Sequence, residues 1–199
     1  MASTGTKAAD ILETAENLAR NRGYHGFSYR DIAAKVGIKS ASVHYHFPTK
    51  ADLGVAVARR YTDRFLAALG DPRDPKTAPR LLLARYAAAF RKSLVEDRQM
   101  CLCGLFGAEV AVLPAPVAAE VRGFFERSVE WLQVVLARDG SGGAVDEAES
   151  RRRALTILAA LQGAMIVART LGRVEVFDDI VEGTISSPST PLTAGMKAD

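Results

Sequence analysis

The sequence predicts an all-α protein of about nine helices. Apolar residues recur three and four positions apart along most of the chain, which is the spacing of one face of an α-helix. Clusters of glycine and proline interrupt these periodic stretches at intervals that suit helix lengths. No stretch shows a convincing apolar and polar alternation of the kind that half-buried β-strands have.

The composition indicates an ordinary globular protein. The 199 residues are 48% hydrophobic and 25% charged, enough for one substantial core or two small ones. No uncharged apolar run reaches about 18 residues, so we expect no membrane contact. Residues 1–10 lack the apolar core of a signal peptide, so we expect a cytoplasmic protein.

The first predicted helix spans residues 7–22. Ile11, Ala15 and Leu18 fall on one stripe at helical spacing, and Gly23 ends the helix. Residues 1–6 are small and polar and are predicted to fray. In the connector that follows, Phe27 is expected to anchor a small N-terminal head.

Two short helices with a tight turn between them follow, at residues 29–36 and 40–47. Ser28 precedes the first helix and an aspartate lies three residues after it, which is the spacing of a capping box. Gly37 ends this helix, where a left-handed residue is needed. Pro48 ends the second helix, and a threonine with a further aspartate caps the next one.

The second short helix has a mostly polar outer surface. A helix, a glycine-containing turn and a short helix of this kind are typical of a helix-turn-helix, whose second helix enters the major groove of DNA. Serine, tyrosine, histidine and lysine side chains bind phosphates and base edges. We predict DNA contacts from Ser28, Tyr29, Lys39, Ser40, Ala41, Ser42, His44, Tyr45, His46 and Lys50. The alternative is a pair of short core helices.

The charge distribution favours the first interpretation. Residues 1–50 hold seven basic and four acidic side chains, whereas residues 51–199 hold 19 of each. The net charge of +3 therefore comes from the predicted head. Basic side chains beside a groove-reading helix favour phosphate binding through the release of counterions.

The same segment resembles the DNA-binding signature of the tetracycline-repressor (TetR) family. The matching residues are Ile32-Ala33-Ala34-Lys35-Val36-Gly37-Ile38, Ser42-Val43-His44-Tyr45-His46-Phe47, Lys50 and Leu53. Lys39, Ala41 and His44 depart from the serine, glycine and tyrosine that are common in the family. These departures alter the surface expected to face DNA, and with it the operator sequence.

The rest of the chain is predicted to form a helical second domain at residues 51–185, after a head at residues 7–50. Residues 186–199 are predicted to be a disordered tail because serine and proline are frequent there. Breaker clusters at residues 70–75 and 139–143 are predicted loops. The predicted helices are 50–70, 77–96, 100–113, one from the proline break at 114–116 to 138, 146–171 and 174–185.

The helix predicted at residues 100–113 is almost entirely apolar, which predicts burial. Gly104 and Gly107 lie inside it and permit close approach of another helix or a ligand. Glu109, its one charge, is expected to face solvent or form an ion pair. Cys101 and Cys103 provide no disulfide framework, and on a helix they point to roughly opposite sides. We expect two buried thiols, with a thiol redox sensor as the alternative.

The resemblance implies a homodimeric transcription regulator, most often a repressor that leaves a palindromic operator when it binds a small molecule. We expect the dimer to form through residues 146–171 and 174–185. On the longer helix, small residues permit close packing, and on the last helix two larger ones would complete the interface. These residues are Ala160, Gly163, Ala164 and Val167, then Phe177 and Val181.

Aromatic and sulfur-containing side chains recur on the predicted inner stripes of the second domain. They predict a pocket for a small apolar or aromatic effector, with hydrogen bonds from Tyr61, Tyr86 and Gln162. The alternative is a solid core. The predicted lining is Tyr61, Phe65, Tyr86, Phe90, Met100, Cys103, Phe106, Phe124, Trp131, Gln162 and Met165.

The sequence contains no candidate catalytic or metal site. Its three histidines lie within the head at no zinc-like spacing, and no nucleophile is paired with a base. We therefore expect no enzymatic activity, no cofactor and no metal. A constitutive DNA-binding or interaction module without small-molecule input stays open as an alternative to an effector-controlled regulator.

Overall fold

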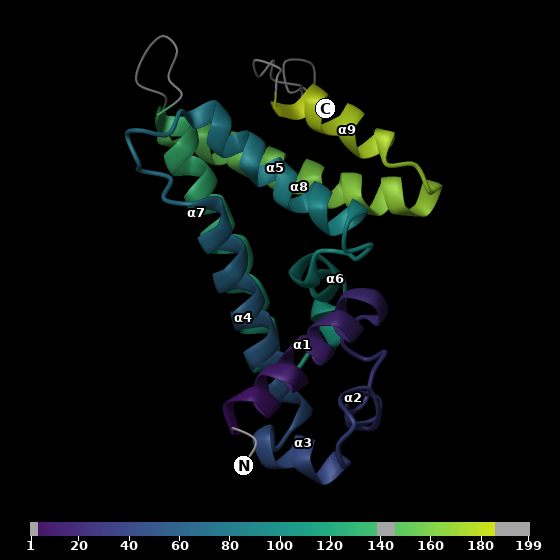
Figure 1. Cartoon of the computed structure of the whole chain (residues 1–199). Helices are drawn as coiled ribbons and strands as arrows, with labels where there is room; N and C mark the ends of the chain where they lie inside the picture. The colour runs from purple at the N-terminus through teal and green to yellow at the C-terminus, as the bar shows by residue number, and fades with distance from the viewer. Residues whose placement is uncertain (1–3, 139–145, 186–199) are drawn as a thin grey trace, which may run out of the picture.

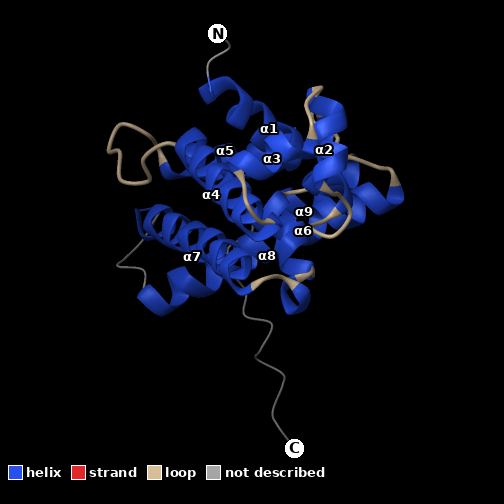
Figure 2. Cartoon of the chain, turned by 90° about the horizontal axis from the view of Figure 1, so that it is seen from below, coloured by secondary structure: helices blue, strands red, loops and turns tan. Residues whose placement is uncertain are grey.

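The structure, a computed structural model, describes residues 4–138 and 146–185, with side chains from Lys7 onward. This part of the chain is all-α, as predicted, with nine α-helices and one short 3-10 helix (Figures 1 and 2). The predicted tail at residues 186–199 and the predicted loop at 139–143 lie outside the described residues.

Helices α1 (Thr4–Arg22), α2 (Tyr29–Val36) and α3 (Ser40–His46) form the head at the lower end of the molecule (Figure 1). The predicted capping box is present, with the Ser28 and Asp31 side chains each bonded to the other residue's backbone N–H. Gly37 ends α2 with a φ of 72°, a conformation that glycine adopts without strain. Local signals therefore place these helix ends.

Helix α4 (Lys50–Leu69) leaves the head and runs beside α7 (Ala115–Arg138) into the body of the molecule (Figure 1). A second capping box, between Thr49 and Asp52, starts α4 immediately after the helix-turn-helix. Any tilt of α4 therefore moves both the head and the body.

The body contains α5 (Pro79–Val95), α6 (Leu102–Ala108), α7, α8 (Glu147–Leu171) and α9 (Glu175–Ile185). The loop between α4 and α5 is held by Arg138, whose guanidinium donates to the backbone oxygens of Pro72, Asp74 and Thr77. Helix α9 packs along α8. The body thus packs on α4 through α5 and α7, with α8 and α9 farther out.

The helix predicted at residues 100–113 is shorter than expected. Helix α6 covers only Leu102–Ala108, and the 3-10 helix η1 (Val110–Val112) follows. The prediction that this whole stretch is buried was wrong, because Val110 and Val112 are 51% and 64% exposed. The backbone leaves the helix at Glu109, whose side chain turns toward the head, as described below.

The two internal glycines of α6 do permit close approach. A Cβ on Gly104 would lie 2.2 Å from Oε1 of Gln162 on α8, and one on Gly107 would lie 3.2 Å from the Phe125 ring on α7. A side chain at position 104 would displace the Gln162 amide from its present place, so the glycine lets α6 and α8 keep this close approach.

Head and body share one continuous apolar core. Tyr24 at the end of α1 packs edge-to-face on Phe106 of α6, with ring centroids 5.6 Å apart. A Cβ on Gly54 of α4 would lie within 3.0 Å of both Tyr24 and Val117. The boundary predicted at residue 50, between the head and the second domain, therefore stays a prediction. The apolar core continues across it without a break.

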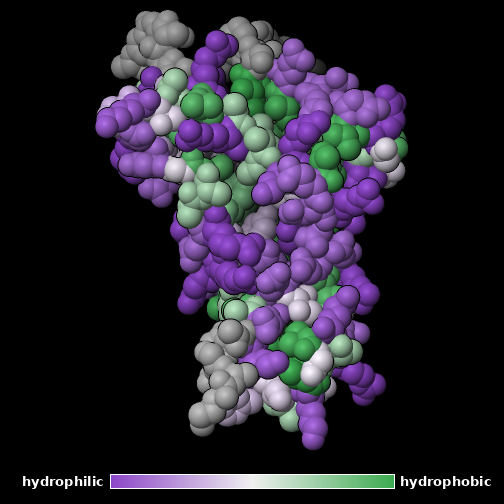
Figure 3. All heavy atoms as spheres, viewed as in Figure 1, coloured by the Kyte–Doolittle hydropathy of each residue, from purple (hydrophilic) through white to green (hydrophobic). Residues whose placement is uncertain are grey.

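Helix α8 is the one helix among the described residues that is long and apolar enough to cross a membrane. The core helix of a globular protein meets the same test, and α8 packs here against α5, α7 and α9. On the face seen in Figure 3, apolar residues gather on the upper body, while the waist above the head is hydrophilic.

Candidate functional site

The outer face of α3 carries the most exposed large side chain among the described apolar and aromatic residues, Tyr45, at 78%. Ser42 and Ala41, three and four residues before it, are also exposed and lie about one turn away on the same face. This face lies at the end of the molecule farthest from the body (Figure 1). An aromatic side chain with a free phenolic end, surrounded by small polar residues, is suited to contacts with DNA phosphates and bases.

A shallow hollow of about 360 Å³ adjoins this face. It is lined by Ser42, Tyr45 and His46 of α3 together with Lys7 of α1. Lys7 was not among the predicted DNA contacts. Only its positive charge could have identified it, because the position of Lys7 next to the α3 residues of this hollow is a long-range feature.

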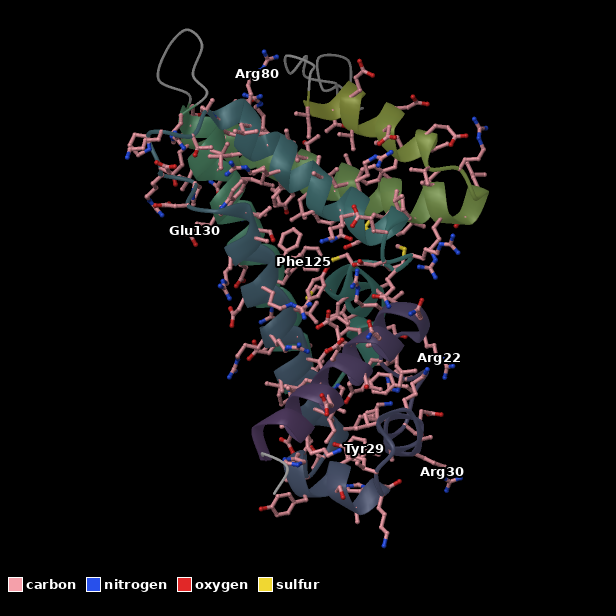
Figure 4. All side chains as sticks on the ribbon, viewed as in Figure 1. Arg22, Tyr29, Arg30, Arg80, Phe125 and Glu130 are labelled. Carbon is pink, nitrogen blue, oxygen red and sulfur yellow. The ribbon has the colours of Figure 1, made fainter. Side chains whose placement is uncertain are left out.

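Tyr29 has a structural role that the sequence did not reveal. Its side chain is 9% exposed, and its hydroxyl donates to the backbone oxygen of Phe47 at 2.8 Å. Burial and the charge of Asp52 raise the pKa of Tyr29 to about 12. Because this hydroxyl ties α2 to the end of α3, Tyr29 is engaged inside the head (Figure 4).

The two histidines of α3 are placed differently from each other. The His44 ring packs on Tyr29 with centroids 4.5 Å apart, and its Nδ1 lies 3.4 Å from the backbone oxygen of Pro48. His46 meets the Tyr45 ring edge-on at 5.3 Å. His44 therefore braces the turn after α3, and His46 supports the exposed tyrosine.

Lys50 lies inward in this structure. Its ammonium group donates to the backbone oxygen of Phe27 and lies 4.6 Å and 5.0 Å from the ring centroids of Phe27 and Tyr24. Burial lowers the pKa of Lys50, and the nearby Glu109 carboxylate acts in the opposite direction. A phosphate contact from Lys50 would require this ammonium group to exchange partners.

The remaining predicted contacts lie at the ends of the two helices. Lys39 is the exposed N-cap residue of α3, and Ser40 is half-buried beside it. Ser28 is exposed, but its hydroxyl is bonded to Asp31 at 2.7 Å. Arg30 points away from the head in Figure 4 and adds positive charge on the α2 side.

The predicted effector lining is partly assembled into one cluster of rings in the body. Phe65 of α4 lies at its centre, with centroids 5.4 Å from Phe90 and Phe124 and 5.6 Å from Tyr86. Trp131 stacks on Tyr86 at 5.6 Å, and Tyr61 extends the cluster toward the head. The rings are in mutual contact in this conformation. We refer to Tyr61, Phe65, Tyr86, Phe90, Phe124 and Trp131 as the aromatic cluster.

The other predicted lining residues lie around this cluster. Cys103 and Met165 are fully buried, whereas Met100 and Phe106 lie against the head through Arg20 and Tyr24. The Gln162 amide donates to Sγ of Cys101 at 3.4 Å. These five residues therefore do not form a single wall with the rings.

Two family descriptions match separate parts of the chain. Residues 11–57 match "Bacterial regulatory proteins, tetR family". Residues 75–182, more than half of the chain, match "Transcriptional regulator LmrA/YxaF-like, C-terminal domain". The first range covers the helix-turn-helix, and the second covers the body with the aromatic cluster.

Similar proteins agree with these matches. A TetR transcriptional regulator from Legionella pneumophila is 32% identical, with a TM-score of 0.84 over 94% of this chain and 98% of that one. The repressor DhaR of Mycobacterium sp. strain GP1 is 26% identical over 68% of each chain. The uncharacterized regulator YxaF of Bacillus subtilis is 23% identical over 85% of this chain and 88% of its own. The chain belongs to the TetR family of transcriptional regulators.

Proposed function

We propose that this regulator is a homodimeric repressor that binds a palindromic double-stranded operator and releases it on binding a small apolar or aromatic effector. The observation that carries the proposal is the exposed face of α3, with Tyr45 at its centre. Regulators of this family are generally DNA-binding proteins without enzymatic activity, and we propose none here. The proposed location is the cytoplasm, where the operator is.

DNA contact is proposed for α3 in the major groove. Ser42, Tyr45 and His46 would reach phosphates or base edges, and the flanking Lys39 and Lys7 would reach phosphates. The basic excess in residues 1–50 supports this orientation, since each neutralised phosphate releases counterions.

Dimer formation is proposed through the outer face of α8. Large apolar side chains are 42–56% exposed there, an unusual density on a monomer surface; they are Leu155, Ile166, Val167 and Leu171.

Two of the residues predicted for this interface were misplaced. Ala164 is 1% exposed and Phe177 is 1% exposed, so both are buried in the core of their own chain. Gly163, by contrast, has open space at its Cβ position.

The proposed effector site is the aromatic cluster. The Tyr86 hydroxyl is buried without a hydrogen-bond partner among the described residues, as is Oγ of Ser128. Burial is the main cause that raises the pKa of Tyr86, and the neighbouring Ser128 hydroxyl acts in the opposite direction. A small rotation would let these two neighbouring hydroxyls pair with each other, whereas an effector with one polar group would pair with them as they stand.

The effector would have to separate rings that are now in contact. Phe65 and Tyr61 belong to α4, so their displacement would tilt the helix that carries the head. The Arg20 guanidinium of α1 lies 5.7 Å from the Tyr61 ring centroid, a direct contact between head and cluster. Such coupling releases DNA only if the effector prefers the arrangement of the heads that cannot bind the operator. In typical systems this preference is about 1–3 kcal/mol.

A thiol redox function has less support. Cys101 and Cys103 are both buried, and burial raises the pKa of Cys103 well above its usual range. A raised pKa disfavours the thiolate, which is the reactive form. The burial of both thiols and the raised pKa of Cys103 therefore favour the effector proposal over a redox sensor.

The experiment measures binding of the purified protein to DNA flanking its gene by fluorescence anisotropy, with and without a panel of apolar and aromatic compounds. Saturable binding to a palindrome, lost on addition of one compound class, is the expected result. Binding that no compound of a broad metabolite panel alters would favour a constitutive DNA-binding module. Absence of any preference for the flanking DNA over random DNA would overturn the proposal.

A further inference from the structure

A second hollow lies at the waist of the molecule, where α1, α4 and the segment between α5 and α6 meet. It measures about 380 Å³, within the range of roughly 300–1,000 Å³ that small-molecule sites occupy. Its walls are polar and charged, in keeping with the hydrophilic waist in Figure 3. No residue of the aromatic cluster or of α3 lines it.

Glu16 of α1 is the central charge of this hollow and is only 4% exposed. Its Oε1 accepts a hydrogen bond from Arg64 of α4 at 2.6 Å, and the guanidinium of Arg20 lies 4.0 Å away. Its Oε2 lies 3.8 Å from Nη1 of Arg60, beyond hydrogen-bond length. Three arginines thus surround one buried carboxylate, and one oxygen of that carboxylate makes no hydrogen bond among the described residues.

Three buried polar atoms on residues that line the hollow lack hydrogen-bond partners within the described part of the chain. They are Oε2 of Glu16, Nη1 of Arg60 and Oε1 of Gln99. The other end of the Gln99 amide is engaged, since it donates to Asn17 at 3.1 Å. Native proteins rarely bury unpaired polar groups, so three at one hollow point to a bound species, either water or a small molecule, that supplies the missing partners.

The missing partners define the chemistry of that species. Two unpaired acceptors and one unpaired donor call for a molecule with at least two donors and one acceptor. Arg20, Arg60 and Arg64 are matched on the walls by three carboxylates, one of them Asp97, so the hollow favours a ligand without net charge. An ammonium group supplies three N–H donors, and a carboxylate accepts from a guanidinium.

We propose that this hollow binds a small zwitterion of the α-amino acid class. Its ammonium group pairs with Glu16 and Gln99, and its carboxylate pairs with Arg60. Because Glu16 belongs to α1 and Arg60 to α4, the ligand joins the head to the helix that links it to the body. The site is separate from the aromatic cluster, and its occupancy is measured without DNA or effector.

The test uses the purified full-length protein and each proteinogenic amino acid in turn, by isothermal titration calorimetry and thermal unfolding. At least one amino acid is expected to bind with one site per chain and to raise Tm, because a ligand that binds only the folded state stabilises it. Gln99→Met removes one acceptor and should raise Kd at least about fivefold. Arg60→Met removes the carboxylate partner and should raise Kd at least about tenfold.

Gln133→Met on α7 is the matched control, since Gln133 lies outside this hollow and its variant should bind as the wild type does. Arg60 lies on α4 and Gln99 lies between α5 and α6, so one variant still tests the proposal if the other unfolds. No heat of binding for any amino acid at millimolar concentration, with only ordered water in the hollow of a crystal grown under those conditions, would overturn the proposal. Binding that both variants leave unchanged would also overturn it.

Discussion

The carboxylate of Glu109 accepts a hydrogen bond from the backbone N–H of Tyr24, with 2.7 Å between Oε2 and the nitrogen. Glu109 ends α6 in the body, and Tyr24 begins the connector from α1 to the helix-turn-helix. One side chain of the body therefore holds a backbone group of the head in place. The Lys50 ammonium group packs on the Tyr24 ring from within the head.

Glu109→Ala should lower the free energy of unfolding by about 1–3 kcal/mol, because the half-buried Tyr24 N–H loses its acceptor. Urea unfolding followed by circular dichroism measures the change. Glu126→Ala, an exposed glutamate on α7, is the control and should change stability by less than about 0.5 kcal/mol. Equal stability of the two variants would show that the hydrogen bond is not maintained in solution.

Gly23→Ala should cost more stability than Gly37→Ala. Both glycines have positive φ, 75° and 72°, so both substitutions carry the left-handed strain of about 1–2 kcal/mol. Only at Gly23 would the added Cβ also meet Oε1 of Glu109, at 2.2 Å, whereas Gly37 has open space. In a Glu109→Ala background the two substitutions should cost the same; a persistent difference would locate the conflict elsewhere.

Tyr45→Ala should abolish specific operator binding without a change in Tm, because this side chain is 78% exposed and supports no core packing. Anisotropy with operator and with random DNA measures the loss. Leu81→Ala, at 49% exposure on α5, is a surface control that should bind DNA normally. A folded Tyr45→Ala protein with wild-type operator affinity would place the DNA interface elsewhere.

Lys39→Ala should affect DNA binding, whereas Lys50→Met should affect the stability of the fold. Lys39 is exposed, so its loss should leave Tm unchanged and reduce the slope of log affinity against log salt by about one unit. Lys50 bonds to the Phe27 backbone and packs on two rings, so its loss should lower Tm. Operator titrations at several salt concentrations, with melting curves, separate the two effects. Wild-type stability of Lys50→Met would show that the inward contacts are dispensable.

Gly163→Arg should convert the dimer to monomers and weaken binding to a palindrome. The Cβ position has open space within the described chain, so the arginine should not disturb the fold of the monomer. Gly123→Arg on α7, where the Cβ position is also open, is the matched control and should stay dimeric. Sedimentation velocity decides the outcome, and a monomeric wild type would refute the proposed assembly.

The sequence by itself determined most of the helices, and the start of α2, the end of α2 and the start of α4. Both capping boxes, the left-handed Gly37 and the periodic apolar stripes act within a few residues, so each could be located from neighbours in the chain. The polar outer face of α3 is equally local, since Val43 faces inward at helical spacing and leaves Tyr45 outside.

Only the tertiary structure decided how these helices meet. It assigned Tyr29 and Lys50 to contacts inside the head, although their residue types fit DNA contacts equally well. It ended α6 early at Glu109 and buried Phe177 against its own chain. These outcomes depend on contacts between surfaces that are tens of residues apart in the sequence. The burial and the hydrogen bonding of a side chain are set by the partner that it meets there, and its neighbours in sequence do not determine that partner.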